Sequence, residues 1–248
     1  MTPLHRQIVV AATAGRAFAV FTTEIGQWWP LERFSVGGAG SSVEFKNGRL
    51  VETAADGDTH EWGEVTAWAP PERLAFSWHP GRPDEPASHV EVTFVEVTKG
   101  TTLVTLTHSG WERLAEPAAA REEYRNGWPL VLARLGDAIG TEPAAPIAAA
   151  WFALLHTSNL TPELSVFADD RFAGHVAFLQ WLDGRGWLVA AGPLGDQDGA
   201  GLTVARVPGD KVGELVEAAH QQDASVAEGL FDVLVRPWQV RFATPHSR

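Results

Sequence analysis

The sequence predicts an α+β protein made of two regions with different patterns. A run of short alternating apolar segments fills most of the first 115 residues, and apolar residues at helical spacing follow at 116–140. After a segment with two prolines at 141–150, strand and helix patterns alternate. We therefore expect a first domain at 1–140, a linker at 141–150 and a second domain at 151–248.

The first region is expected to open with a strand and a short helix. The apolar run QIVVAA is typical of a strand, and Thr13 follows it at the position of a helix N-cap. Phe18 and Phe21 are three residues apart, so they lie on one face of the helix that Thr13 begins. This helix is expected to bury its aromatic face.

Antiparallel strands are expected next. The segment SSVEFKNGRLVET predicts a hairpin, because its Asn47-Gly48 dipeptide readily takes the positive φ angles of a tight turn. The segment HEWGEVTAWAPPERLAFSWHP predicts two strands joined at a Pro-Pro pair, and a further hairpin turns at a Lys-Gly pair. A helix at 116–140 ends the region, with a periodic face formed by Tyr124, Trp128, Leu132 and Leu135.

The second region is predicted to have the order βαββαβ, which is the ferredoxin-like order. Its strands are expected at 151–157, 188–194, 202–207 and 231–242, and its helices at 169–183 and 210–221. One unit of this kind leaves a sheet face uncovered, so we expect it to pair with a second copy or with the first domain. The pattern alone leaves both of these pairings open.

Composition and charge disfavour several classes of function. The formal net charge is -12, and an evenly spread negative charge repels phosphate backbones, so nucleic-acid binding is not expected. The chain has no cysteine, which fits a reducing cytoplasm, and its nine histidines form no HxxxH or HxxEH pair. We therefore expect neither a metal nor an organic cofactor. No long apolar run predicts export or membrane insertion.

Several segments of the first region resemble a known family. FTTEIGQWWP, EWGEVTAWAPPERLAFSW, TLVTLTHSGW and the Gly127-Trp128 pair are similar to the AHSA-type branch of the SRPBCC, or START-like, superfamily, over nearly all of 1–140. The resemblance implies a helix-grip fold, in which a curved antiparallel sheet wraps a long C-terminal helix around an internal cavity. Members bind lipids, polyketides and other apolar molecules, and some are cyclases or hydrolases.

The second region resembles the YciI-like family of the dimeric α+β barrel superfamily. The resemblance lies in HVAFLQWLDGRGWLVAAGPL, DASVAEGLF and VLVRPWQV, and it spans about 151–241. It implies a ferredoxin-like unit that dimerises through its sheet, with an active site built around a histidine and an aspartate. This chain has Asp-Ala-Ser where the family often has Asp-Pro-aromatic, so its pocket entrance is expected to differ.

His175 is the first candidate for chemistry. It lies on the same helical side as Leu179, so its ring is expected to point toward the sheet. A lone histidine on an apolar face is more often a core group, but the YciI-like resemblance favours acid-base catalysis, and imidazoles exchange protons near neutral pH. Asp223, where the family's aspartate lies, is the first choice of partner, with Asp196 and Asp198 as alternatives.

The first region offers a cavity rather than a catalytic set. Strand alternation places two sets of residues on single faces, Leu74, Phe76 and Trp78 on one strand and Val104, Leu106 and His108 on another. If these faces are concave, four tryptophans surround a pocket that binds an apolar ligand: Trp62, Trp78, Trp111 and Trp128. His108 would then be the polar anchor. The alternative is that the aromatic residues fill the interior completely.

Two hypotheses for function follow. The first is a cofactor-independent enzyme that uses His175 and an aspartate for isomerisation, cyclisation or elimination on an aromatic, lactone-like or polyketide-derived intermediate. The second is a non-catalytic protein that binds an apolar ligand in its first domain and dimerises through its second. An open cleft where His175 meets a carboxylate would favour the first, and a sealed His175 the second. A co-chaperone role ranks third.

Overall fold

The computed structural model describes residues 1–82, 85–140, 149–161, 164–195 and 199–240. They belong to two compact units, Met1–Ala145 and Pro146–Arg248. The mixed α+β class, with a large antiparallel sheet and helices, is confirmed. The predicted linker at 141–150 lies outside the described residues except for its last two. No helix in the described part of the chain is long and apolar enough to cross a membrane.

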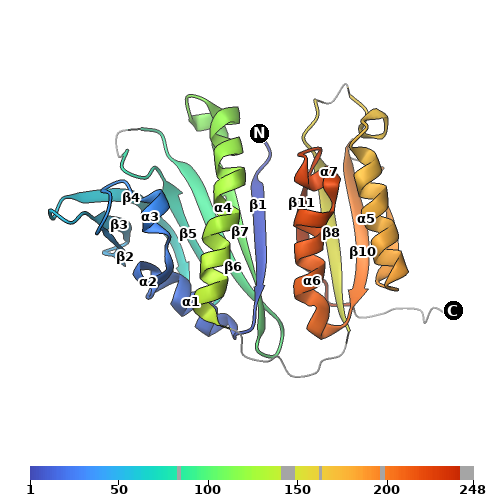
Figure 1. Ribbon diagram of the computed structural model, residues 1–248, viewed down its shortest axis with the longest axis horizontal. Helices are drawn as coiled ribbons and strands as arrows, with labels where there is room; N and C mark the ends of the chain where they lie inside the picture. Colours follow the sequence, from blue (N-terminus) through green and yellow to red (C-terminus); the bar gives the residue numbers. More distant parts are fainter. Residues whose placement is uncertain (83–84, 141–148, 162–163, 196–198, 241–248) are drawn as a thin grey trace. The chain divides into compact units, whose positions relative to one another are not determined.

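The first unit contains a seven-stranded antiparallel sheet in the order β1-β7-β6-β5-β4-β3-β2 (Figure 1). Its strands are β1 (Leu4–Val10), β2 (Ser42–Lys46), β3 (Arg49–Thr53), β4 (Thr59–Ala69), β5 (Arg73–Trp78), β6 (Ser88–Thr98) and β7 (Thr101–Ser109). Its helices are α1 (Ala14–Thr22), α2 (Ile25–Trp28), α3 (Leu31–Phe34) and α4 (Pro117–Ile139). The long helix α4 packs on the sheet, with most of its strand contacts to β1.

Local signals account for the main elements of this unit. Thr13 accepts a hydrogen bond from the backbone N–H of Arg16, so the predicted N-cap of α1 is confirmed. The predicted hairpin is confirmed as β2 and β3, where Asn47 has φ 51° and Gly48 has φ 73°. The predicted helix at 116–140 corresponds to α4 within one residue at each end.

The core of the first unit lies between the sheet and the helices and is rich in aromatic residues. The predicted inward faces of β5 and β7 are buried, and Trp128, Leu132 and Leu135 of α4 are buried with them. Phe18 and Phe21 of α1 make edge contacts with Phe94 at ring centroid distances of 5.4 and 5.8 Å. The periodicity of the sequence therefore places the correct faces in the core.

The second unit contains a four-stranded antiparallel sheet in the order β11-β8-β10-β9. Its strands are β8 (Ala150–Ser158), β9 (Leu188–Pro193), β10 (Ala200–Val207) and β11 (Phe231–Pro237). Its helices are α5 (Phe172–Gly184), α6 (Val212–Glu217) and the short α7 (Ala224–Ala227), and Figure 1 shows them beside the strands. The chain thus runs strand, helix, two strands, helices and strand.

Two helices of this unit differ from the expected ranges. Residues 169–171 form a turn instead of the first turn of α5, because the Asp169 side chain accepts hydrogen bonds from the backbone and the guanidinium of Arg171. The helix expected at 210–221 is α6 followed by a π-turn over 218–222. This wide turn ends at Asp223 and so delivers that residue to the start of α7.

Candidate functional site

His175 projects from α5 and is largely buried, with 9% of its surface exposed. At the preceding residue, Gly174, an added Cβ would come within 2.8 Å of the Cβ of Ala224 and 2.9 Å of the backbone nitrogen of Ser225. The lack of a side chain at Gly174 therefore lets α5 approach the start of α7 closely. This approach brings His175 next to Asp223.

Asp223 begins α7 as its N-cap and is completely buried. Its Oδ1 accepts hydrogen bonds from the backbone N–H of Ser225 at 3.0 Å and from the Ser225 hydroxyl at 2.5 Å. Its Oδ2 lies 2.8 Å from Nδ1 of His175. Burial alone would raise the pKa of Asp223, but hydrogen bonds from His175 and Ser225 hold it below its ordinary value. The structure thus brings together the two residues that the sequence paired.

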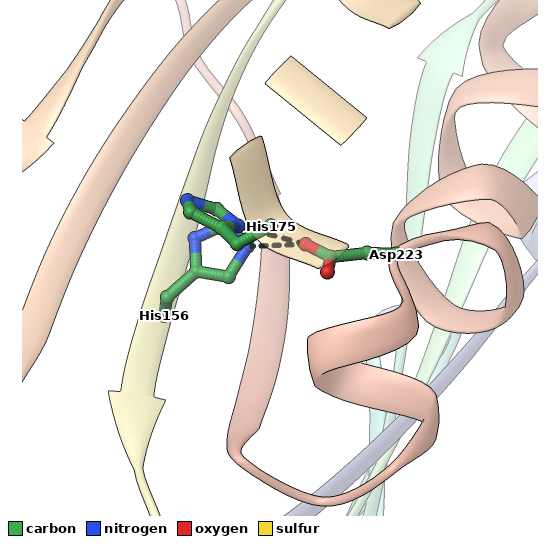
Figure 2. A group of neighbouring side chains, drawn as sticks. All are labelled: His156, His175 and Asp223. Carbon is green, nitrogen blue, oxygen red and sulfur yellow. Dashed lines mark hydrogen bonds and ion pairs between the residues drawn. The ribbon is translucent and has the colours of Figure 1, made fainter. Parts of the chain in front are cut away.

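A second histidine, His156 of β8, lies beside this pair (Figure 2). Its ring centroid is 4.6 Å from that of His175, and its Nε2 is 3.8 Å from Oδ2 of Asp223, beyond hydrogen-bonding distance. Burial and the neighbouring His175 lower the pKa of His156. Sequence analysis missed His156, although it continues the buried alternation of Phe152 and Leu154 and is the one polar residue in that series.

An apolar cavity of about 120 Å³ adjoins the two imidazoles. His156 and His175 form part of its wall, and most of the remainder is apolar, including Phe172, Leu179, Pro193, Leu202 and Phe231. Phe167 also lines the cavity and is 62% exposed, so an aromatic ring lies at its rim. A small apolar molecule in this cavity would therefore lie against His175.

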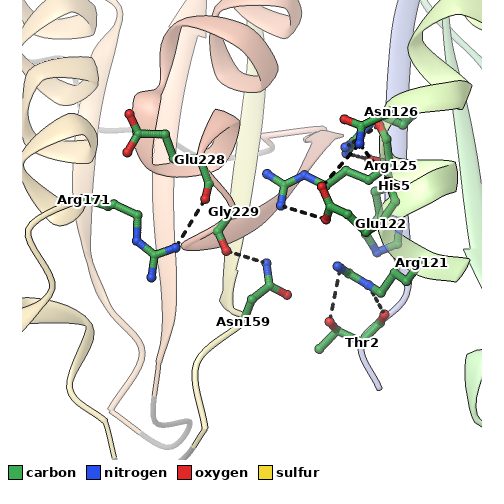
Figure 3. Close-up of polar contacts among 11 residues, drawn as sticks. Thr2, His5, Arg121, Glu122, Arg125, Asn126, Asn159, Arg171, Glu228 and Gly229 are labelled. Carbon is green, nitrogen blue, oxygen red and sulfur yellow. Dashed lines mark hydrogen bonds and ion pairs between the residues drawn. The ribbon is translucent and has the colours of Figure 1, made fainter. Parts of the chain in front are cut away.

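Polar contacts tie the end of α7 to its neighbours. The guanidinium of Arg171 donates to the carbonyl of Glu228 at 3.3 Å, and the amide of Asn159 donates to the carbonyl of Gly229 at 3.3 Å (Figure 3). Arg171 also pairs with Asp169 at 2.7 Å. Its contacts are therefore those of a structural cation, and they support the segment that follows Asp223. Asp196 and Asp198 lie outside the described residues.

The first unit has its own cavity, of about 300 Å³, between α4 and the sheet. Trp62, Trp78 and Trp128 line it as the sequence suggested, together with Trp29 and Tyr124, which sequence analysis did not select. A neighbouring hollow of about 450 Å³ shares Trp78, Arg82, Glu123 and Tyr124 with it. The aromatic residues of this unit therefore do not fill its interior completely.

His108 and Trp111 are not among the residues that line this cavity. The His108 Nδ1 accepts a hydrogen bond from the Trp128 indole at 3.0 Å, and its Nε2 lies 2.7 Å from the Ser88 hydroxyl. An indole N–H can only donate, so Nδ1 is the acceptor and Nε2 carries the proton. Burial lowers the pKa of His108 to about 3. With both nitrogens in use, His108 fixes Trp128 instead of anchoring a ligand.

Glu52 of β3 organises one wall of the cavity and is completely buried. Its carboxylate accepts hydrogen bonds from the Ser35 hydroxyl, from the backbone of Val36 at 2.8 Å and Gly37 at 3.0 Å, and from the Trp62 indole at 3.0 Å. Ser35 and Trp62 both line the cavity. A single buried carboxylate therefore joins the loop after α3 to the tryptophan of β4.

Comparison with known proteins identifies the first unit. The family model described as "Activator of Hsp90 ATPase homolog 1-like protein" matches residues 11–140. Among solved structures, CalC from Micromonospora echinospora, described as a self-sacrificing resistance protein, is 27% identical, with a TM-score of 0.45, over 55% of this chain and 93% of its own.

Two further solved structures are less similar in sequence. An HSP90 activator from Plasmodium falciparum is 20% identical, with a TM-score of 0.40, over 54% of this chain and 94% of its own. The Aha1 dimer from Colwellia psychrerythraea is 17% identical, with a TM-score of 0.42, over 56% and 96%. A search of the curated proteins finds no match. Through residues 11–140, the chain belongs to the Activator of Hsp90 ATPase homolog 1-like family.

Proposed function

We propose that the chain is a small-molecule enzyme in which His175 and Asp223 form an acid-base pair. The observation that supports this function is the position of the His175 ring, which bonds to Asp223 at 2.8 Å and also lines an apolar cavity. The reaction is an isomerisation, cyclisation or elimination on an aromatic, lactone-like or polyketide-derived intermediate. No cofactor takes part in the proposed chemistry.

The hydrogen bond to Asp223 sets the tautomer of His175. A carboxylate accepts from Nδ1–H, which leaves the lone pair of Nε2 free to take a proton from a molecule in the cavity. Figure 2 places the other nitrogen of the His175 ring on the side away from Asp223. A positioned histidine accelerates such a step by about 10²–10⁴-fold, so the substrate must already be an activated carbon acid.

The assignment of the second unit belongs to the same proposal. Its strand order of β11-β8-β10-β9 supports a ferredoxin-like, YciI-like domain. We also propose that the chain forms a homodimer through this domain and that it is located in the cytoplasm. Sedimentation of the full chain across micromolar concentrations tests the dimer, and a monomer at every concentration would reject it.

Nitrobenzisoxazole is a suitable probe for the proposed base. Removal of its ring C–H proton forms a nitrile, breaks the N–O bond and leaves a coloured phenolate, so one base in an apolar pocket suffices. We expect the wild type, kept in a chelator, to accelerate this reaction. His175→Gln should lower kcat/KM by about 100-fold or more, because it removes the base. Asp223→Asn should cause a loss of similar size, because the two Ser225 donors hold the amide oxygen and the amide NH2 then donates to Nδ1, which leaves Nε2 protonated and unable to accept a proton.

Two variants of the same unit serve as controls. His220→Gln and Asp210→Asn remove an imidazole and a carboxylate that do not line the cavity, and both should retain the wild-type rate. Equal rates for wild type and His175→Gln would reject the acid-base pair. Circular dichroism of each variant separates a loss of activity from a loss of fold.

The second candidate function is binding of an apolar ligand by the first unit, and the aromatic cavity of about 300 Å³ favours it. Gly127 of α4 lines this cavity, and an added Cβ would lie 3.9 Å from Phe34, in ordinary contact. A larger side chain at this position would enter the cavity without a backbone clash. The cavity can therefore be filled from the helix side.

Gly127→Leu is expected to weaken binding of anilinonaphthalene sulfonate, a fluorescent apolar anion, by at least about 10-fold, or 1.4 kcal/mol. The leucine would occupy the space between the tryptophans, while the helix would gain a better helix former. Gly136→Ala on the same helix is the control, because its Cβ would contact Ile8 instead. Unchanged probe affinity in Gly127→Leu would show that the probe does not use this cavity.

A further inference from the structure

His156 has no hydrogen-bond partner among the described residues, although it is only 3% exposed. Leaving a buried polar group unpaired costs about 1–3 kcal/mol of stability. A ligand that bonds to a ring nitrogen of His156 would remove this cost. Oδ2 of Asp223 lies 3.8 Å from Nε2 of His156, and the backbone of Leu154 is also near the ring without a hydrogen bond of ordinary geometry. An ion small enough to lie between Nε2 of His156 and Oδ2 of Asp223 could bond to both atoms. We call the space between these two atoms the gap.

Three potential ligand atoms converge on this gap. His156, His175 and Asp223 each offer one atom, and these atoms all lie within 4.8 Å of one another. The residues come from β8, α5 and the start of α7, so three separate elements hold the cluster. Figure 2 shows both imidazoles directed at the same carboxylate. Among the described residues this is the one group of three such side chains.

We propose that His156, His175 and Asp223 bind a divalent transition metal ion, with Zn²⁺ as the favoured ion. Two imidazoles and one carboxylate suit Zn²⁺, whereas Ca²⁺ and Mg²⁺ prefer sites made of oxygen atoms. Small side-chain shifts bring the three atoms to the zinc distance of about 2.0–2.2 Å. His156 then gains the partner that it lacks.

The surroundings of the three residues support a bound metal. The backbone and hydroxyl of Ser225 hold Oδ1 of Asp223, which leaves Oδ2 directed at the two histidines. Both histidines also line the apolar cavity, and a solvent molecule that enters from it would be the fourth donor. Zn²⁺ takes the place of the proton shared by His175 and Asp223, and that proton passes to solvent.

Metal binding also regulates the proposed chemistry, and this consequence rests on the proposed function. With Zn²⁺ on Nδ1 of His175 and Oδ2 of Asp223, the hydrogen bond that sets the His175 tautomer is lost. The metal-bound protein is therefore inactive in proton transfer, and the chelated protein is active. The binding itself does not depend on the proposed function.

The direct test is titration of the chelator-treated, dialysed full chain with Co²⁺, followed by competition with Zn²⁺ in calorimetry. We expect one Co²⁺ per chain with the intense visible absorption of a four-coordinate site. His156→Phe should weaken binding by more than the roughly 10–100-fold that the loss of a supporting partner costs. His175→Gln is the second ligand variant, and His220→Gln, an imidazole outside the cluster, should bind like the wild type.

His156→Phe also carries an internal check on folding. The substitution removes unpaired polar atoms from a buried position, so the metal-free variant should be at least as stable as the metal-free wild type. Zn²⁺ should raise the Tm of the wild type and leave that of His156→Phe unchanged. If the wild type binds Co²⁺ no better than His156→Phe and His175→Gln, or if the absorption stays that of the hydrated ion, the metal site is rejected.

The two proposals fail separately. Metal binding is measured without substrate, and ring opening of nitrobenzisoxazole is measured in chelator. If the chelated protein is active and does not bind Co²⁺, only the metal site is wrong. If it binds Co²⁺ and the chelated form is inactive, only the acid-base function is wrong.

Discussion

Replacing Glu52 with alanine is expected to destabilise the first unit by about 3–5 kcal/mol. The substitution removes the acceptor of four hydrogen bonds, and the backbone of Val36 and Gly37 and the indole of Trp62 would lose their partner. Urea unfolding followed by tryptophan fluorescence measures this loss. Glu44→Gln, at a side chain that is 57% exposed, should change the free energy of unfolding by less than about 0.5 kcal/mol.

Glu52 also makes stability depend on pH. Burial alone would raise its pKa, but hydrogen bonds from Ser35 and the backbone of Val36 and Gly37 hold the pKa below the ordinary value of 4.5. Since the pKa is lower in the folded state, this contribution is complete above the ordinary value and is lost as the pH falls through the folded-state pKa. The stability difference between wild type and Glu52→Gln should therefore shrink on acidification.

The same substitution tests how the cavity is built. Ser35 and Trp62, which Glu52 joins, both line the aromatic cavity. Glu52→Gln should therefore weaken binding of anilinonaphthalene sulfonate even at temperatures where the unit remains folded. A variant with unchanged stability at every pH and unchanged probe binding would contradict the assignment of Glu52 as the anchor of this wall.

Much of the fold could be predicted because its signals are local. The Asn47-Gly48 turn, the Thr13 cap and the helical spacing in 116–140 each lie within a short stretch of chain, and the structure confirms all three. The start of α5 was wrong by three residues because a side chain competes with the helix there. Asp169 binds Arg171 locally, and no periodicity of apolar residues reveals this contact.

The candidate site could be predicted only in part because its contacts are distant in sequence. The pairing of His175 with Asp223 came from a family resemblance, since residues 48 positions apart leave no periodic signal. His156 could have been flagged as a polar residue at a core position, but the helix residue that faces it could not be read from the sequence. His108 was placed on the correct face, and its two hydrogen bonds then excluded the expected role.

Gly63→Ala is the second substitution with a large expected effect. Gly63 follows Trp62 in β4, and an added Cβ would lie 1.7 Å from the backbone oxygen of Ser77 in β5. A carbonyl oxygen held in a sheet cannot move away without breaking the pairing of β4 with β5, so we expect a loss of about 3 kcal/mol. Gly127→Ala adds the same methyl group to α4, where the new Cβ would lie 3.9 Å from Phe34 in ordinary contact. It should raise the free energy of unfolding by up to about 1 kcal/mol, because alanine is a better helix former than glycine.

The opposite signs of these two substitutions make the test specific. A general intolerance to alanine would lower the stability of both variants, whereas the close approach of β4 and β5 predicts a loss only at Gly63. Trp62 precedes Gly63 and Trp78 follows Ser77, so the two tryptophans flank the point of contact. The carbonyl of Trp62 also accepts a hydrogen bond from the backbone N–H of His79 at 2.8 Å. Gly63→Ala should therefore also displace two cavity-lining tryptophans and weaken probe binding. Wild-type stability in this variant would disprove the close approach, and with it this account of how the sheet positions the cavity wall.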